Sequence, residues 1–174
     1  MPDLTFQVAN ARAVPSLASP AIALALRIAN LEDQQIDSIT LRCQVQIETP
    51  RRRYTEAEQT SLLHLFGEPA RWGQTLRPML WANVASAVPA FSGSTAVDLM
   101  LPCTADPQSA VTGYFTALEG GLVPITLLFS GMTFYLTRDG QLQAAPISWS
   151  SEARFAFPVD VWKASILAAA KAGA

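Results

Sequence analysis

Hydrophobic and polar residues alternate along two neighbouring stretches in the first third of the chain. The first stretch has apolar residues at positions 22, 24, 26 and 28. The second is longer, and its apolar residues are Ile39, Leu41, Cys43, Val45 and Ile47. A period of two is typical of a strand with one buried and one solvated face. Because only the short polar segment 31–35 separates the two stretches, the pattern predicts an antiparallel hairpin.

A capping box predicts a helix soon after this hairpin. Thr55 and Glu58 have the spacing at which the hydroxyl accepts from the Glu58 amide while the carboxylate reaches back to the Thr55 amide. Apolar residues then recur on one stripe up to Phe66, so we expect a helix over about 56–66. The chain's one histidine, His64, lies opposite that stripe and is expected to be exposed.

Strand signals dominate the rest of the chain. Strands are expected within 75–101, where prolines and a Ser-Gly-Ser turn interrupt them, and at 122–136, 142–149 and 153–157. Gly131 lies inside the longest of these strands and predicts a bulge or bend. Further helices are expected after the N-cap signal Asp106-Pro107 and over about 159–171.

These elements predict a mainly β fold, in the range from all-β to α+β. Seven to nine strands follow one another without regular helical crossovers, a pattern that disfavours a doubly wound parallel sheet. We expect an antiparallel β-sandwich or open barrel with two to three helices inserted between strands. No linker or repeat divides the 174 residues, so one domain is expected over 1–174. The alanine-rich tail, 168–174, is expected to fray.

Composition excludes some classes of function. Half of the residues are hydrophobic, 15% are charged and the net charge is −2, which argues against a protein that mainly grips nucleic-acid phosphates. The start of the chain has no signal-peptide pattern and no apolar run approaches a membrane span, so we expect a cytoplasmic protein with no membrane contact. Cys43 and Cys103 lie in no CxxC motif and are expected to be buried, reduced thiols.

Catalytic and metal-binding chemistry finds little support in the sequence. One histidine cannot supply a multi-histidine metal site, and the chain has no HExxH motif and no Gly-rich phosphate loop. A serine or cysteine nucleophile would need His64 as its base, yet His64 is expected on a solvated helix face. We therefore expect no catalytic residues, no metal site, no cofactor and no enzymatic activity.

Arginine and aromatic residues gather between positions 51 and 81. They are Arg51, Arg52, Arg53, Tyr54, Arg71, Trp72, Arg77 and Trp81. Such residues are enriched at protein interfaces, and they also suit stacking of single-stranded nucleic acid, which the net charge disfavours. A third interpretation places the two tryptophans in the core and the arginines at strand and helix ends. With these alternatives open, we treat the eight residues as a candidate binding site for a protein surface that carries carboxylates.

The same region carries a resemblance to a known family. The motifs are RRRY at 51–54, LFGEP at 65–69, RWG at 71–73, TLRPMLW at 75–81, PCT at 102–104 and LLFSGMTFY at 127–135. In this order they resemble an uncharacterised bacterial family, domain of unknown function 6084, over nearly the whole chain. Genes of that family often lie beside those of uptake NiFe hydrogenases and their maturation factors. The resemblance implies an accessory or assembly role in that system, with a hydrogenase subunit or maturation factor as partner. Because two distant cysteines and one histidine are a poor supply of metal ligands, we expect a non-enzymatic scaffold and not a metal carrier.

A second class of function is a small-ligand-binding or enzymatic sandwich. Its pocket would be lined by Trp72, Trp81, Phe129, Phe134 and Tyr135. Self-association is a further expectation, because a sandwich has edge strands that can pair between copies and half of the chain is hydrophobic.

Overall fold

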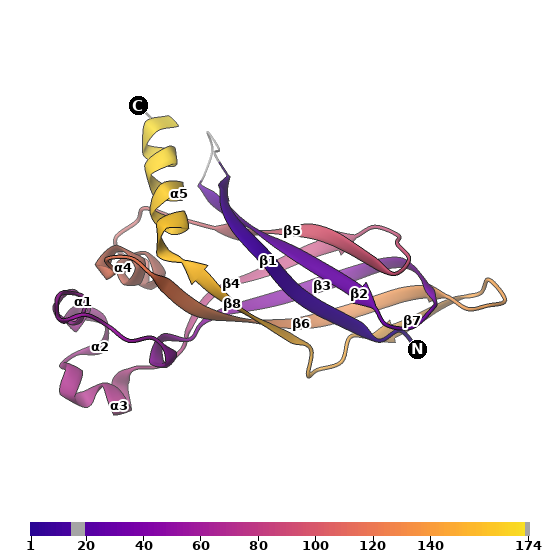
Figure 1. Cartoon of the computed structure of the whole chain (residues 1–174), viewed down its shortest axis with the longest axis horizontal. Coiled ribbons are helices and arrows are strands. Elements are labelled where there is room, and N and C mark those ends of the chain that lie inside the picture. The colour runs from indigo at the N-terminus through magenta and orange to yellow at the C-terminus, as the bar shows by residue number, and fades with distance from the viewer. Residues whose placement is uncertain (15–19, 173–174) are drawn as a thin grey trace.

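A computed structural model describes residues 1–14 and 20–172, and eight strands within them form two antiparallel sheets (Figure 1). Sheet A has the strand order β1-β2-β5. Its strands are β1 (Leu4–Val14), β2 (Ala21–Asn30) and β5 (Ser94–Pro102). Sheet B has the order β4-β3-β6-β7, and β8 also pairs with β6. Its strands are β4 (Met79–Val88), β3 (Gln35–Ile47), β6 (Leu122–Leu136), β7 (Leu142–Pro146) and β8 (Glu152–Pro158).

The core lies between the two sheets. Leu24 and Leu26 of β2 and Leu41 and Val45 of β3 are 0% exposed, because the alternation that the sequence shows directs one side of each strand inward. Phe6 in β1 and Phe129 in β6 stack with ring centroids 4.2 Å apart, which joins one sheet to the other. The prediction of a mainly β, antiparallel sandwich with inserted helices is confirmed.

The predicted hairpin between the first two alternating stretches is wrong. β2 pairs with β1 and β5 in sheet A, whereas β3 pairs with β4 and β6 in sheet B. The segment 31–34 therefore carries the chain from one sheet to the other. Asn30 fixes this passage: its Nδ2 donates to the Gln34 carbonyl over 3.1 Å and its backbone amide to the Gly93 carbonyl over 2.8 Å. Alternation identifies the buried face of a strand and leaves its pairing partner open.

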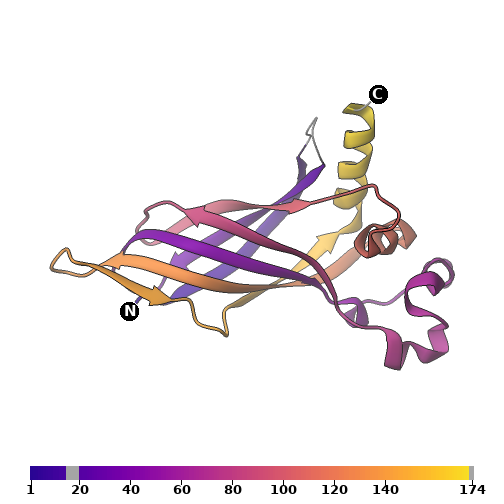
Figure 2. The ribbon, with the colours of Figure 1, turned by 180° about the vertical axis from the view of Figure 1, so that it is seen from behind.

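Helical segments gather at one end of the sandwich (Figures 1 and 2). They are η1 (Thr49–Arg51), α1 (Glu56–Ser61), α2 (Leu63–Phe66), η2 (Pro69–Arg71), α3 (Trp72–Thr75), α4 (Ala110–Ala117) and α5 (Val159–Ala172). The connections from β3 to β4 and from β5 to β6 leave the sheets at this end, and α5 follows β8 there. We call the segments 48–78, 103–121 and 159–172 the helical end.

Several predicted boundaries differ from the structure. The helix expected over 56–66 breaks at Leu62, where φ is −95° and ψ is 1°, and becomes α1 and α2. The helix expected after Asp106-Pro107 begins later, because Ser109 is its N-cap and accepts from the Thr112 amide. The strand expected over 142–149 ends at Pro146. The predicted fraying concerns a tail whose last residues, 173–174, and whose side chains from 169 onward lie outside the described part.

Both cysteines are free and buried, as predicted. Burial raises the pKa of the Cys43 thiol to about 12. Burial also raises the pKa of Cys103 to about 11, although a hydrogen bond with Ser165 acts in the opposite direction. Because the thiolate is the reactive form, both side chains are protonated and unreactive at neutral pH and serve as small apolar core residues.

Candidate partner-binding site

The junction between β3 and α1 carries the triple arginine and is built on the predicted capping box. The Glu58 amide donates to Thr55 Oγ1 over 3.1 Å, and the Thr55 amide donates to Glu58 Oε1 over 2.9 Å. The capping box is therefore confirmed. It fixes the start of α1 directly after residues 51–54 and so holds the arginines in a defined conformation.

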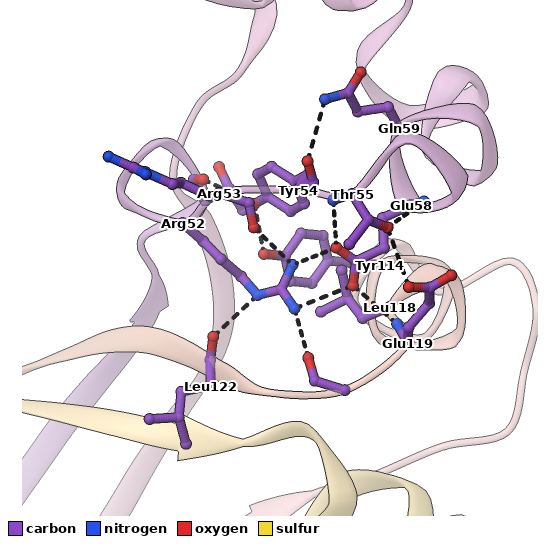
Figure 3. Close-up of polar contacts among 12 residues, drawn as sticks. Arg52, Arg53, Tyr54, Thr55, Glu58, Gln59, Tyr114, Leu118, Glu119 and Leu122 are labelled. Atoms are coloured by element: carbon purple, nitrogen blue, oxygen red, sulfur yellow. Dashed lines mark hydrogen bonds and ion pairs between the residues drawn. The ribbon is translucent and has the colours of Figure 1, made fainter.

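Arg52 is the central residue of this junction, and it points inward (Figure 3). Its two terminal nitrogens contact the two carboxylate oxygens of Glu58, each over 3.1 Å. The remaining hydrogen bonds go to backbone carbonyls, from Nε to Leu122 over 3.0 Å and from the terminal nitrogens to Gly120 over 2.6 Å and Arg53 over 3.2 Å. A guanidinium has five N–H groups, so every donor of Arg52 has a partner. Its side chain is only 9% exposed.

Glu58 is the matching acceptor and is 2% exposed. Oε1 accepts from Arg52 and Thr55, and Oε2 accepts from Arg52 and from the Glu119 amide over 2.9 Å. Burial alone would raise the pKa of this carboxyl group, but the hydrogen bonds from Arg52 and from the two backbone amides outweigh burial and lower the pKa below its usual value. The sequence indicated the capping role of Glu58 but not its burial, because Arg52 and the 119–122 segment meet it only in the folded chain.

The Arg52–Glu58 pair predicts a specific loss of stability in acid. The pKa of Glu58 is lower in the folded chain than in the unfolded chain, so the ionised carboxylate contributes its full stability above the unfolded value of about 4.3. That contribution disappears as pH falls through the folded pKa. We expect the difference in Tm between the native chain and Glu58→Gln to be largest at neutral pH and to shrink on acidification. A difference that stays constant down to pH ~3 would contradict a charged, paired Glu58.

Tyr54 and Trp72 are half-buried and support the junction from the other side. The Tyr54 hydroxyl donates to the Thr49 carbonyl over 2.8 Å and lies 2.7 Å from the Tyr114 hydroxyl, which therefore donates to it. The Trp72 ring meets the Tyr54 ring edge-on at 5.4 Å, and its indole N–H donates to the Gly67 carbonyl over 2.9 Å. Both aromatic residues have internal partners and also reach the surface.

The eight sequence candidates fall into three groups. Arg52 and Trp81 have internal partners and little exposed surface: the Arg52 side chain is 9% exposed, and the buried Trp81 ring lies 5.1 Å from Phe115 and 5.0 Å from Phe157 in an aromatic cluster under the helical end. Tyr54 and Trp72 are half-buried. The exposed group consists of Arg51, Arg53, Arg71 and Arg77. In Figure 3 the Arg53 side chain extends away from the Arg52–Glu58 pair.

The structure does not bring together the five aromatic residues of the alternative ligand pocket. Trp72 lies in α3, outside the sheets, whereas Trp81 belongs to the cluster around Phe115. The Phe129 side chain is 2% exposed, and its ring stacks against the Phe6 ring. Phe134 and Tyr135 are consecutive in β6 and therefore point to opposite faces of sheet B.

His64 is exposed, as predicted, and lies beside α4. A β-carbon added at Gly113 would lie 3.2 Å from His64 Nε2, so the glycine permits this close approach. In the part of the chain that the structure describes, no three His, Cys, Asp or Glu side chains are grouped to hold a metal ion. The described helices are also too short or too polar for any of them to cross a membrane.

The model of a family of unknown function, DUF6084, matches residues 1–171. The chain belongs to this family. Comparison with curated proteins finds no match. Among solved structures, this DUF6084 protein is similar to a protein named as ApaA from Bordetella pertussis, with 15% identity, a TM-score of 0.35 and coverage of 90% of this chain and 95% of that one. It is also similar to a β-glucosidase from Kluyveromyces marxianus, with 10% identity, a TM-score of 0.32 and coverage of 90% of this chain and 15% of that one. These TM-scores are too low to bear on function.

Proposed function

We propose that this protein is a non-enzymatic, cytoplasmic accessory or assembly protein that binds a protein partner through the exposed arginines of its helical end. The observation that carries the proposal is the contrast within the triple arginine. Arg52 has a partner for every donor, whereas Arg51 and Arg53 on either side of it are exposed. Among the described residues, neither of them lies within ion-pair distance of a carboxylate.

A firmly held backbone makes these exposed arginines suitable for recognition. The Arg52–Glu58 pair and the capping box fix residues 51–54 on α1 and on the 119–122 segment. A guanidinium presented from a fixed backbone loses less conformational entropy on binding. Its planar fork matches a carboxylate in two parallel hydrogen bonds, so the partner surface we propose is acidic.

The gene neighbourhood that the family resemblance implies suggests a subunit or maturation factor of an uptake NiFe hydrogenase as the partner. Co-purification with a tagged hydrogenase subunit tests this. We expect Arg51→Glu/Arg53→Glu to reduce recovery of the partner at least about tenfold, because charge reversal turns attraction into repulsion at both positions. Arg52 is kept in this variant, since its loss would unfold the junction and hide any effect on binding.

A matched control is Arg27→Glu/Arg138→Glu, which makes the same change in charge at exposed positions in β2 and in the β6–β7 turn, away from the helical end. It should leave recovery unchanged. Circular dichroism must be the same for both variants and Tm nearly so, since all four side chains are exposed and the Arg138–Asp33 ion pair that the control removes is itself solvent-exposed. Equal recovery with the two variants would remove the arginine surface from the proposal, and no recovery with the native chain would remove the hydrogenase partner.

A further inference from the structure

The edge of sheet B is interrupted opposite the middle of β6. β3 pairs along one edge of β6, while the other edge pairs with β8 over residues 122–128 and with β7 over 132–136. The chain between β7 and β8 leaves the sheet at Ile147, whose amide donates to the Gly131 carbonyl over 3.0 Å. It returns at Ser151, whose carbonyl accepts from the Phe129 amide over 3.0 Å. Residues 148–150 form a short loop pushed out of the sheet.

This loop is internally hydrogen-bonded and presents Trp149 at its tip. The Ser148 and Ser150 hydroxyls lie 2.9 Å apart, and the Ser151 amide donates to the Ser148 carbonyl over 3.0 Å. Trp149 is 94% exposed. A tryptophan buries a large apolar area when it binds and is among the residues most enriched at interface hot spots. Because the loop already holds its conformation, binding through this ring would order little additional chain.

A groove of about 640 Å³ runs beside Trp149 on the outer face of sheet B. Trp149 is one of its lining residues. The side chains of its floor come from β3, β4 and β6 and are Arg42, Gln44, Asn83, Ala85, Leu128 and Ser130. They form two rows across the sheet, because Gln44 pairs with Asn83 and Leu128, and Arg42 pairs with Ala85 and Ser130.

The chemistry of this groove favours hydrogen-bond acceptors in the ligand. Arg42 and the Trp149 indole can only donate, whereas Gln44, Asn83 and Ser130 can both donate and accept, and no carboxylate lines the groove. A proline-rich segment complements such a surface, because proline has no N–H and leaves the backbone carbonyls of the extended polyproline II helix unpaired. The proline ring is also the apolar group that binds aromatic side chains in known peptide-recognition grooves.

The dimensions of the groove agree with a short segment of this kind. From β4 through β3 and β6 to the Trp149 loop there are three strand spacings, or about 14 Å at ~4.8 Å per spacing. A polyproline II helix rises ~3.1 Å per residue, so four to five residues would span this distance. We propose that the outer face of sheet B binds a proline-rich, extended segment of a partner protein, with Trp149 as its aromatic anchor and Gln44, Asn83 and Arg42 as donors to its carbonyls.

This site lies outside the helical end, so its test is independent of the hydrogenase experiment. The full-length protein would be titrated into fluorescein-labelled decaproline, and fluorescence anisotropy would report binding. We expect saturable binding by the native chain, at least a tenfold loss in Trp149→Ala, and a smaller loss in Gln44→Ala/Asn83→Ala. Leu31→Ala, which removes another exposed apolar side chain, should bind like the native chain.

Three outcomes would overturn the proposal. The first is no binding of decaproline at ~1 mM, where even a weak site worth about −4 kcal/mol would be half filled, or equal binding by the native chain and Trp149→Ala. The second is a homodimer, measured by light scattering, that becomes a monomer in Trp149→Ala without any peptide binding. The third is equally tight binding of a glycine-serine decapeptide or of maltohexaose, which lack the preformed proline helix. Trp149→Ala is suited to this test because its exposed ring contributes little to the fold.

Discussion

Replacement of Arg52 by methionine should lower the free energy of unfolding by about 3–5 kcal/mol, the usual result of breaking a buried ion pair by removing one partner. The physical cause is Glu58, which would remain 2% exposed with its charge unpaired. Three carbonyls would lose their donor as well, at Arg53, Gly120 and Leu122. Urea unfolding followed by circular dichroism measures the change, and we expect Tm to fall by roughly 10 °C.

Neighbouring substitutions make this expectation specific. Arg51→Met and Arg53→Met remove exposed arginines from the same segment and should change stability by less than ~0.5 kcal/mol. Arg52→Met/Glu58→Gln should recover part of the loss of Arg52→Met, because the unpaired charge is gone while the glutamine oxygen can still accept from the Thr55 amide. Equal effects of all three single substitutions would show that the Arg52–Glu58 pair does not hold the junction together.

The local elements of this fold could be predicted from the sequence where one signal dominates. The uninterrupted alternation from Ile39 to Ile47 and the apolar run from Leu122 to Leu136 identified β3 and β6, the two longest strands. The capping box identified the start of α1. Each of these signals arises within a few residues of the chain and does not depend on what packs against it.

Long-range arrangements could not be predicted in the same way. β1 was missed, because its pairing with β2 shifts register between Val8 and Asn10 and many of its residues are exposed, so the alternation is weak. The pairing of β2 and β3 was predicted wrongly because both strands direct apolar residues at the same core from opposite sheets. The alternation of apolar and polar residues shows only which face of a strand is buried. It is therefore the same whichever of the two sheets contains the strand.

The candidate site shows the same difference between local signals, which could be predicted, and long-range contacts, which could not. Arg51, Arg52 and Arg53 are equivalent in the sequence, yet only Arg52 turns inward. Its carbonyl partners at Gly120 and Leu122 lie 68 and 70 residues away along the chain, so no local pattern could separate it from its neighbours. Trp149 was assigned to a strand, and its position among serines was the one signal of an exposed turn.

Replacement of Gly131 by alanine should destabilise the protein by about 2–5 kcal/mol, from backbone strain and overpacking together. Gly131 has φ of +129°, and a β-carbon built there would lie 1.9 Å from the Thr40 carbonyl oxygen. The sequence predicted a bulge or a bend at Gly131. The pairing of β6 with β3 continues through Gly131 without a register shift, so there is no bulge in this ladder and the glycine makes only a local change of backbone conformation. Thr40 cannot move aside easily, because it lies within the β3 ladder between β4 and β6.

Gly73→Ala is the matched control for this substitution. Gly73 lies in α3 without a positive φ, and an added β-carbon would meet no atom within 4 Å. Alanine there should leave stability unchanged or raise it by about 0.4–1 kcal/mol, since it reduces the freedom of the unfolded chain. Urea midpoints of the two variants measure the contrast. Similar midpoints would mean that β6 can shift away from β3 at Gly131. Ile147, which precedes the Trp149 loop and donates to the Gly131 carbonyl, would then not hold that loop in a fixed position.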